Sequence, residues 1–175
     1  ISNSSNKINS IRVDSGQANV IIGGDLVVTA AEKTLSLSNR FKTALICNSN
    51  ELITGDFTRN PQLQIKSNNM KLSLISNFKK KSTWFINSTE IAKSNLDNTI
   101  YSNLVLLGYA FQAGLIPLKL QSIFSAIKFN SKKYMMNLNA FNLGRKCYID
   151  NLNKNLSTND VRTEEQKVQN ADTFQ

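Results

Sequence analysis

One short segment of the sequence has residue types that could bind an anion. Gly23-Gly24-Asp25 separates two apolar runs, and backbone amides in a glycine-rich turn at the end of a strand can hold a phosphate group. The longer glycine pattern of a nucleotide site does not surround this turn, and two glycines before an aspartate are more often a plain turn. Gly23, Gly24 and Asp25 are therefore weak candidates for cofactor binding.

Other chemistry is limited by composition. The chain has no histidine, which removes the commonest general base and excludes Ser–His–Asp and Cys–His arrangements. Cys47 and Cys147 have no CxxC spacing, so the sequence predicts neither a zinc site nor an iron–sulfur cluster. Glu51 and Asp56 are unpersuasive as an acid/base pair, because nothing in the sequence shows that they converge. We therefore predict no catalytic residue and no metal ligand.

The formal charge of +9 raises the possibility of nucleic-acid binding. The basic residues are scattered, however, and cluster only at Phe78–Lys81 and at Lys132 and Lys133. No aromatic residues lie between arginines as a base-stacking surface would need. An independent basic α/β module that binds nucleic acid or nucleotide is thus the alternative hypothesis.

The length of 175 residues predicts one domain with its own core. We place that domain at residues 1–150 and expect a polar, partly disordered tail at 151–175. The first residues resemble no targeting signal and lack an initiating methionine, so we expect a cytoplasmic protein whose chain starts inside a longer one.

Short apolar segments alternate with helical patterns, which predicts an α/β fold with a mainly parallel sheet flanked by helices and a C-terminal helical segment. The expected strands are Leu26–Ala30, Thr43–Asn48 and Ser82–Asn87. The expected helices are Ala31–Ser38, Asn69–Phe78, a short helix capped by Ser88, Leu118–Phe129 and Lys133–Asp150.

The segment from Glu51 to Ile65 contains Gly55, Asn60 and Pro61 and is predicted to be a long connecting loop. Loops often carry function, which makes Thr54, Asp56 and Phe57 candidates. A contact with another domain and a contact with a ligand fit them equally well.

The uncharged stretch from Thr99 to Leu118 has the length of a membrane span. Its polar residues, Gly114 and Pro117 oppose that interpretation, since the helix should end near the glycine. About fourteen helical residues reach roughly 21 Å, short of the roughly 30 Å hydrocarbon core of a bilayer. A buried helix is expected instead.

Four segments carry a resemblance to a known family: "VIIGGDLVVTAAEKTLSL", "ICNSNELITGDFTRNPQLQI", "IYSNLVLLGYAFQAGLIPL" and "NLNAFNLGR". In this order they resemble the carboxyl-terminal domain of fused indolepyruvate ferredoxin oxidoreductases, which is similar to the gamma domain of the 2-oxoacid:ferredoxin oxidoreductase superfamily. The resemblance runs from about Ile11 to about Arg145. The first strand, Gly-rich loop and following helix of such a domain are not found before Ile11.

The resemblance implies a parent enzyme that decarboxylates an arylpyruvate on thiamine diphosphate with Mg. It further implies electron transfer through 4Fe-4S clusters to ferredoxin, acyl transfer to coenzyme A, and a homo-oligomeric parent. This chain would be a structural, interdomain part that binds no cofactor alone and is inactive by itself. Asn103 matches an asparagine of the family motif, so it is a candidate for contact with a thiamine-binding domain, beside the alternative of a helix polar group bonded to neighbouring backbone.

Overall fold

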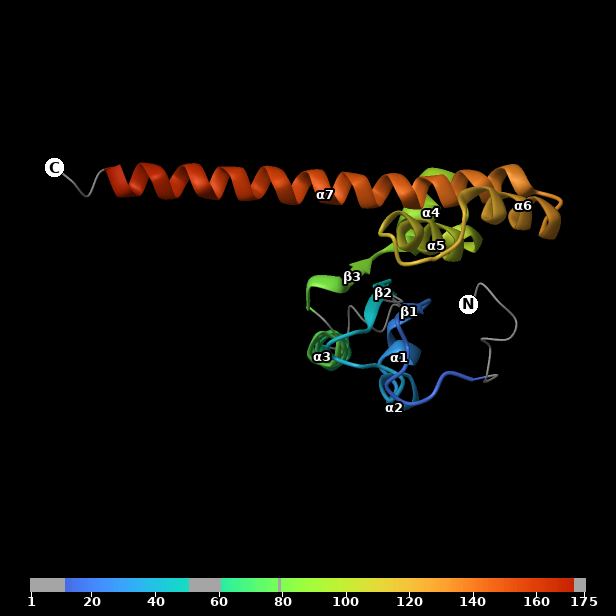
Figure 1. The fold of residues 1–175 in the computed structure, drawn as a ribbon, viewed down its shortest axis with the longest axis horizontal. Coiled ribbons are helices and arrows are strands. Elements are labelled where there is room, and N and C mark those ends of the chain that lie inside the picture. The colour runs from blue at the N-terminus through green and yellow to red at the C-terminus, as the bar shows by residue number, and fades with distance from the viewer. Residues whose placement is uncertain (1–11, 51–60, 79, 172–175) are drawn as a thin grey trace.

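The computed structural model describes residues 12–50, 61–78 and 80–171, and their elements are drawn in Figure 1. The strands are β1 (Val20–Gly23), β2 (Ala44–Asn48) and β3 (Thr83–Ile86). The α-helices are α1 (Leu26–Thr29), α2 (Glu32–Leu35), α3 (Pro61–Asn77), α4 (Ser88–Leu96), α5 (Ser102–Gln112), α6 (Leu120–Asn130) and α7 (Tyr134–Ala171). Two 3₁₀ turns, Lys80–Ser82 and Thr99–Tyr101, precede β3 and α5.

The three strands form one parallel sheet in the order β1-β2-β3, which confirms the predicted fold class. In the register, Ile22 of β1 lies beside Ile46 of β2, and Ile46 lies beside Trp84 of β3. Every residue of β2 is buried, as expected for a central strand with helices on both faces. Helices α1, α2 and α3 lie on one side of the sheet and α4, α5 and α7 on the other (Figure 1).

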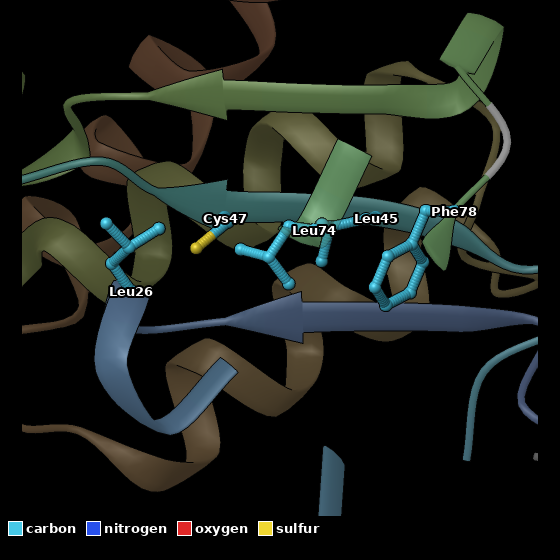
Figure 2. Close-up of a cluster of buried hydrophobic side chains, with 5 residues drawn as sticks. All are labelled: Leu26, Leu45, Cys47, Leu74 and Phe78. Atoms are coloured by element: carbon cyan, nitrogen blue, oxygen red, sulfur yellow. The ribbon is translucent and has the colours of Figure 1, made fainter. Parts of the chain in front are cut away.

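Side chains alternate between the two faces of β2. Leu45 and Cys47 point to the first face, where they form a buried cluster with Leu26 of α1 and with Leu74 and Phe78 at the end of α3 (Figure 2). The three strand arrows run in the same direction behind these side chains. This cluster fixes α3 against the sheet.

The opposite face of β2 is covered by α5. Ile46 and Ile86 of the sheet pack against Leu106, Tyr109 and Ala110 of that helix. Along β2, Ile46 faces α5 whereas its neighbours Leu45 and Cys47 face α3. This alternation is the period of two that is typical of a strand.

Helices α5 and α7 approach each other backbone to backbone. A Cβ atom added to Gly108 of α5 would lie 1.9 Å from the carbonyl oxygen of Phe141, and one added to Gly144 of α7 would lie 1.9 Å from that of Val105. Only glycine permits so close a contact. The pair is reinforced at its edge, where Arg145 Nε donates to Gln112 Oε1 at 3.0 Å.

The predicted strand at Leu26–Ala30 is wrong, since Leu26–Thr29 is the short helix α1 and the strand lies before the turn, at Val20–Gly23. Asp25 is the N-cap of α1: its Oδ1 accepts from the backbone N–H of Val28 at 2.8 Å. The β-branched Val27 and Val28 are exposed rather than buried, so the cap rather than strand propensity decides the local structure.

The starts of two helices differ from expectation. Helix α3 begins at Pro61, so the end of the expected Glu51–Ile65 loop is helical, consistent with the preference of proline for a first helical position. Asn87, not Ser88, caps α4, and its Oδ1 accepts from the N–H of Glu90 at 3.0 Å.

Helix α7 continues through the expected polar tail as far as Ala171. Its 38 residues correspond to about 57 Å, and its C-terminal part extends past the other elements in Figure 1. The division into a domain at 1–150 and a tail at 151–175 stays a prediction.

The uncharged stretch forms α5, which ends before Gly114, a residue with a φ of +75°. Its residues Val105, Leu106 and Tyr109 are buried, so the expectation of a buried helix is confirmed. Across residues 12–50, 61–78 and 80–171, no helix combines the length and apolar character that crossing a membrane requires.

Candidate functional site

Polar residues gather at the carboxyl end of the sheet. The strands end there at Gly23, Asn48 and Ile86, and helices α1 and α4 start immediately beyond β1 and β3. In open α/β sheets, ligands and partner groups usually bind outside this edge. We therefore take the carboxyl edge, defined by Gly24, Asn48 and Asn103, as the candidate site.

Asn48 joins the ends of all three strands. Its Nδ2 donates to the carbonyl oxygen of Gly24 at 3.1 Å and to Thr89 Oγ1 at 2.8 Å. Its Oδ1 accepts from the backbone N–H groups of Ser88 at 3.1 Å and Asn50 at 3.2 Å. The side chain is thus fully engaged and buried, with an exposed fraction of 6%.

Asn103 and Gly24, separated widely in the sequence, lie next to each other. A Cβ atom at Gly24 would be 3.7 Å from Asn103 Oδ1, and both residues are exposed. Asn103 occupies the first turn of α5. The structure therefore brings two independently predicted candidates together at the carboxyl edge, with an amide side chain directed toward the glycine turn.

The other two turn residues have local structural roles. Gly23 is buried, and a Cβ atom there would be 2.0 Å from Thr29 Oγ1, so the site requires glycine for close packing. The Asp25 side chain caps α1, and its carbonyl oxygen accepts from Thr29 Oγ1. Because a carboxylate already occupies the amide of Val28, the plain-turn alternative accounts for these contacts without a bound anion.

The remaining candidates, Thr54, Asp56 and Phe57, lie outside the described residues. Their expected role in a contact stays a prediction. Asn48, Ser88 and Thr89 also lie at the carboxyl edge, and none of them was predicted there. The available signal was the position of Asn48 as a polar residue that closes the apolar run "TALIC", where a buried amide requires several partners.

Ser88 begins α4 behind the carboxyl edge. Its side chain is only 1% exposed, and its hydroxyl has no hydrogen-bond partner among the described residues. A buried hydroxyl without a partner lowers stability.

Ser88→Ala should therefore leave the free energy of unfolding unchanged or raise it by up to about 1 kcal/mol. Urea unfolding followed by the fluorescence of Trp84, the single tryptophan, would measure the change. A loss of more than about 1 kcal/mol would show that the hydroxyl has a partner after all.

The two cysteines lie on opposite faces of the sheet. Cys47 belongs to the cluster under α3, whereas Cys147 of α7 packs against the cluster under α5. Burial raises the pKa of both thiols, and burial likewise raises the pKa of Tyr109, whose hydroxyl oxygen accepts from Asn151 Nδ2 at 3.2 Å. The pKa of Cys147 is raised further by Asp150.

Because the pKa of each of these three groups is raised, the free energy of unfolding should decrease at alkaline pH. Their neutral forms are favoured by folding, so the stabilisation is complete below the unfolded thiol pKa of about 8.5. Above that pH the unfolded chain releases protons that the folded chain retains, and stability falls as pH rises. We expect the urea midpoint to decrease from pH 8 to pH 10, and Cys47→Ala with Cys147→Ala to flatten that decrease. A midpoint that rises over this range would contradict the prediction.

Metal binding finds no support in the described part of the chain, where no three His, Cys, Asp or Glu side chains come together. The edge residues Gly24, Asn48 and Asn103 supply amide and backbone groups alone. Such groups can position a partner or a ligand by hydrogen bonding, but they neither transfer a proton nor act as a nucleophile.

Comparison with known proteins gives one positive result. The sequence pattern of the family described as pyruvate ferredoxin/flavodoxin oxidoreductase matches residues 1–147. No match was found among curated proteins or among solved structures. The family match spans the whole sheet, helices α1 to α6 and the first part of α7, as far as Cys147. The chain therefore belongs to the pyruvate ferredoxin/flavodoxin oxidoreductase family.

Proposed function

We propose that this chain is the gamma-type part of an enzyme that oxidatively decarboxylates 2-oxoacids to acyl-CoA and reduces ferredoxin. The family match over residues 1–147 supports the reaction class. The resemblance of four ordered segments to indolepyruvate ferredoxin oxidoreductases supports arylpyruvates, such as indolepyruvate, as the substrates. Within that enzyme we assign the chain a structural, interdomain role.

The residues of this chain do not fit the redox cofactors of the reaction. A 4Fe-4S cluster is held by four cysteine thiolates, whereas the chain has two cysteines, which lie on opposite faces of the sheet. Other domains would therefore hold the clusters, together with thiamine diphosphate and Mg. For this reason the chain alone should be inactive.

The observation that carries the interdomain role is the pairing of Asn103 with Gly24 at the carboxyl edge. Asn103 is exposed, and an exposed amide next to bare backbone offers donors and acceptors to another surface. Asn48 holds the turn and the start of α4 in place behind it. We propose that this edge, together with Thr54, Asp56 and Phe57, contacts the thiamine-binding domains.

The test uses the complete enzyme with all of its domains. Ferredoxin reduction that depends on both 2-oxoacid and coenzyme A would be measured with indolepyruvate, pyruvate and 2-oxoglutarate. We expect kcat/KM to be largest for indolepyruvate. Asn103→Ala should lower the activity by about tenfold, as for loss of a hydrogen bond in a buried contact.

Asn95→Ala is the matched control, since Asn95 is an exposed asparagine of α4 whose Nδ2 bonds only its own helix, to the carbonyl oxygen of Ile91. It should leave the activity unchanged. Equal effects of the two variants would contradict the interdomain role, and a lack of activity with every 2-oxoacid would contradict the reaction. Salt-sensitive binding of nucleic acid by the chain would instead favour the alternative of a basic binding module.

A further inference from the structure

Two hollows adjoin each other beside α5, α6 and the start of α7, away from the carboxyl edge. The first has a volume of about 380 Å³ and is lined mainly by apolar side chains, including Leu107, Ile123 and Ile127. The second has a volume of about 470 Å³ and contains Lys132 and Lys133. Both volumes are in the range of small-molecule sites.

The hollows are continuous in their lining. Leu104, Ser131 and Asn137 contribute to both, so the open apolar hollow is continuous with the lysine-bearing hollow, which we call the mouth. A hydrogen bond stabilises the backbone at the mouth: Ser131 Oγ accepts from the backbone N–H of Lys133 at 3.2 Å, just before α7 begins. One molecule with an apolar body and a polar end could occupy both hollows.

The charge of this region selects the sign of that polar end. Between Asp97 and Asp150 the sequence contains no acidic residue, whereas it contains basic ones at Lys119, Lys128, Lys132, Lys133, Arg145 and Lys146. Lys132 and Lys133 are exposed, and across the described residues neither forms an ion pair. Asp97 directly precedes Asn98 of the second hollow, but no acidic residue lines either hollow. An anionic group at the mouth would therefore meet Lys132 and Lys133 with no carboxylate in the lining.

We propose that the paired hollows bind a small amphipathic carboxylate, with its alkyl or aryl body among Leu107, Ile123 and Ile127 and its carboxylate at Lys132 and Lys133. The apolar part provides affinity through burial of surface. The lysines provide selection for an anion over a cation or a neutral molecule. This inference is independent of the proposed function, because it concerns binding by the chain itself.

Titration of the folded chain with octanoate, octylammonium and octanol, followed by calorimetry and by amide NMR shifts, tests the proposal. We expect octanoate to bind with a Kd of about 1 mM or lower, at least fivefold more tightly than octylammonium. The largest shifts should fall on residues of α6 and on residues 131–137. Equal binding of the three probes, or no octanoate binding at 10 mM, would overturn the proposal.

Matched variants separate the two parts of the site. Lys132→Gln with Lys133→Gln should weaken octanoate binding about fivefold, whereas Lys33→Gln with Lys42→Gln removes the same charge from exposed positions before β2 and should have less than a twofold effect.

A second set of variants tests the apolar part. Ala126→Phe should fill the apolar hollow and abolish binding, and Ser122→Phe offers a second filling variant at another exposed lining position. Phe129 is 90% exposed and does not line the hollow. Phe129→Ser should therefore leave binding intact, and a loss of binding there would assign octanoate to the open surface and overturn the site.

Discussion

Gly144→Ala is expected to lower the free energy of unfolding by about 3 kcal/mol, the upper part of the usual range for overpacking a well-packed contact. The new methyl group would lie 1.9 Å from the carbonyl oxygen of Val105 and 2.9 Å from the backbone nitrogen of Tyr109. Because both atoms belong to the backbone of α5, no side-chain rotation can relieve the overlap, and the helices must separate. The better helix propensity of alanine, worth about 1 kcal/mol, offsets only part of that loss.

Thermal unfolding should show a decrease in Tm of about 6–12 °C for a chain of this size. Gly24→Ala is the control, since its methyl group would meet only Asn103 Oδ1, at 3.7 Å, and it should change stability by less than about 0.5 kcal/mol. If the Tm of Gly144→Ala equalled that of the unsubstituted chain, the close approach of α5 and α7 would be wrong.

Asn48→Ala should lower the free energy of unfolding by about 4 kcal/mol. The substitution removes hydrogen bonds to Gly24, Thr89, Ser88 and Asn50, each worth about 1 kcal/mol. The buried backbone N–H of Ser88 would then lack a hydrogen-bond partner. Urea unfolding should therefore show a lower midpoint with an unchanged slope.

Asn48→Asp separates the two halves of this network. It retains an acceptor for Ser88 and Asn50 but loses the donor to Gly24 and Thr89. It also places a carboxylate in a site where Asn48 is 6% exposed. We expect it to be at least as destabilising as Asn48→Ala. As a control, Asn95→Ala on the exposed face of α4 should change the free energy of unfolding by less than about 0.5 kcal/mol. An equally small effect of Asn48→Ala would contradict its role in joining the ends of the three strands.

Strands β2 and β3 and the end of α5 were predictable because every local sequence pattern there favours the same structure. The strand β2 consists of four apolar residues followed by Asn48, and β3 has the β-branched and aromatic residues of a strand. The end of α5 was predictable from Gly114, whose positive φ is costly for other residues.

The strand expected at Leu26–Ala30 was wrong because one local signal outweighed another. The segment after Asp25 has strand-like valines, yet the aspartate cap starts a helix there. Helix α7 continues to Ala171, and the sequence from Arg145 to Ala171 contains neither glycine nor proline to stop it. The polar tail expected at 151–175 stays a prediction.

The candidate site could be predicted only in pieces. The glycine turn and Asn103 were each identified, but their proximity depends on how α5 packs on the sheet, which no local pattern records. The role of Asn48 depends on partners from two other strand ends. Such convergence is a property of the tertiary structure rather than of spacing.

The arrangement of helices on the two faces of the sheet sets an order for folding during synthesis. The helices that cover Leu45 and Cys47, α1 and α3, lie between the strands in the chain, whereas α5, which covers Ile46 and Ile86, follows all of them. A nascent chain that has completed β3 therefore exposes one apolar face until α5 leaves the ribosome. Exposed surface of this kind promotes aggregation. Translation pauses that hold β3 outside the ribosome while α5 is still inside it should therefore reduce the yield of folded protein more than pauses after α5 has emerged.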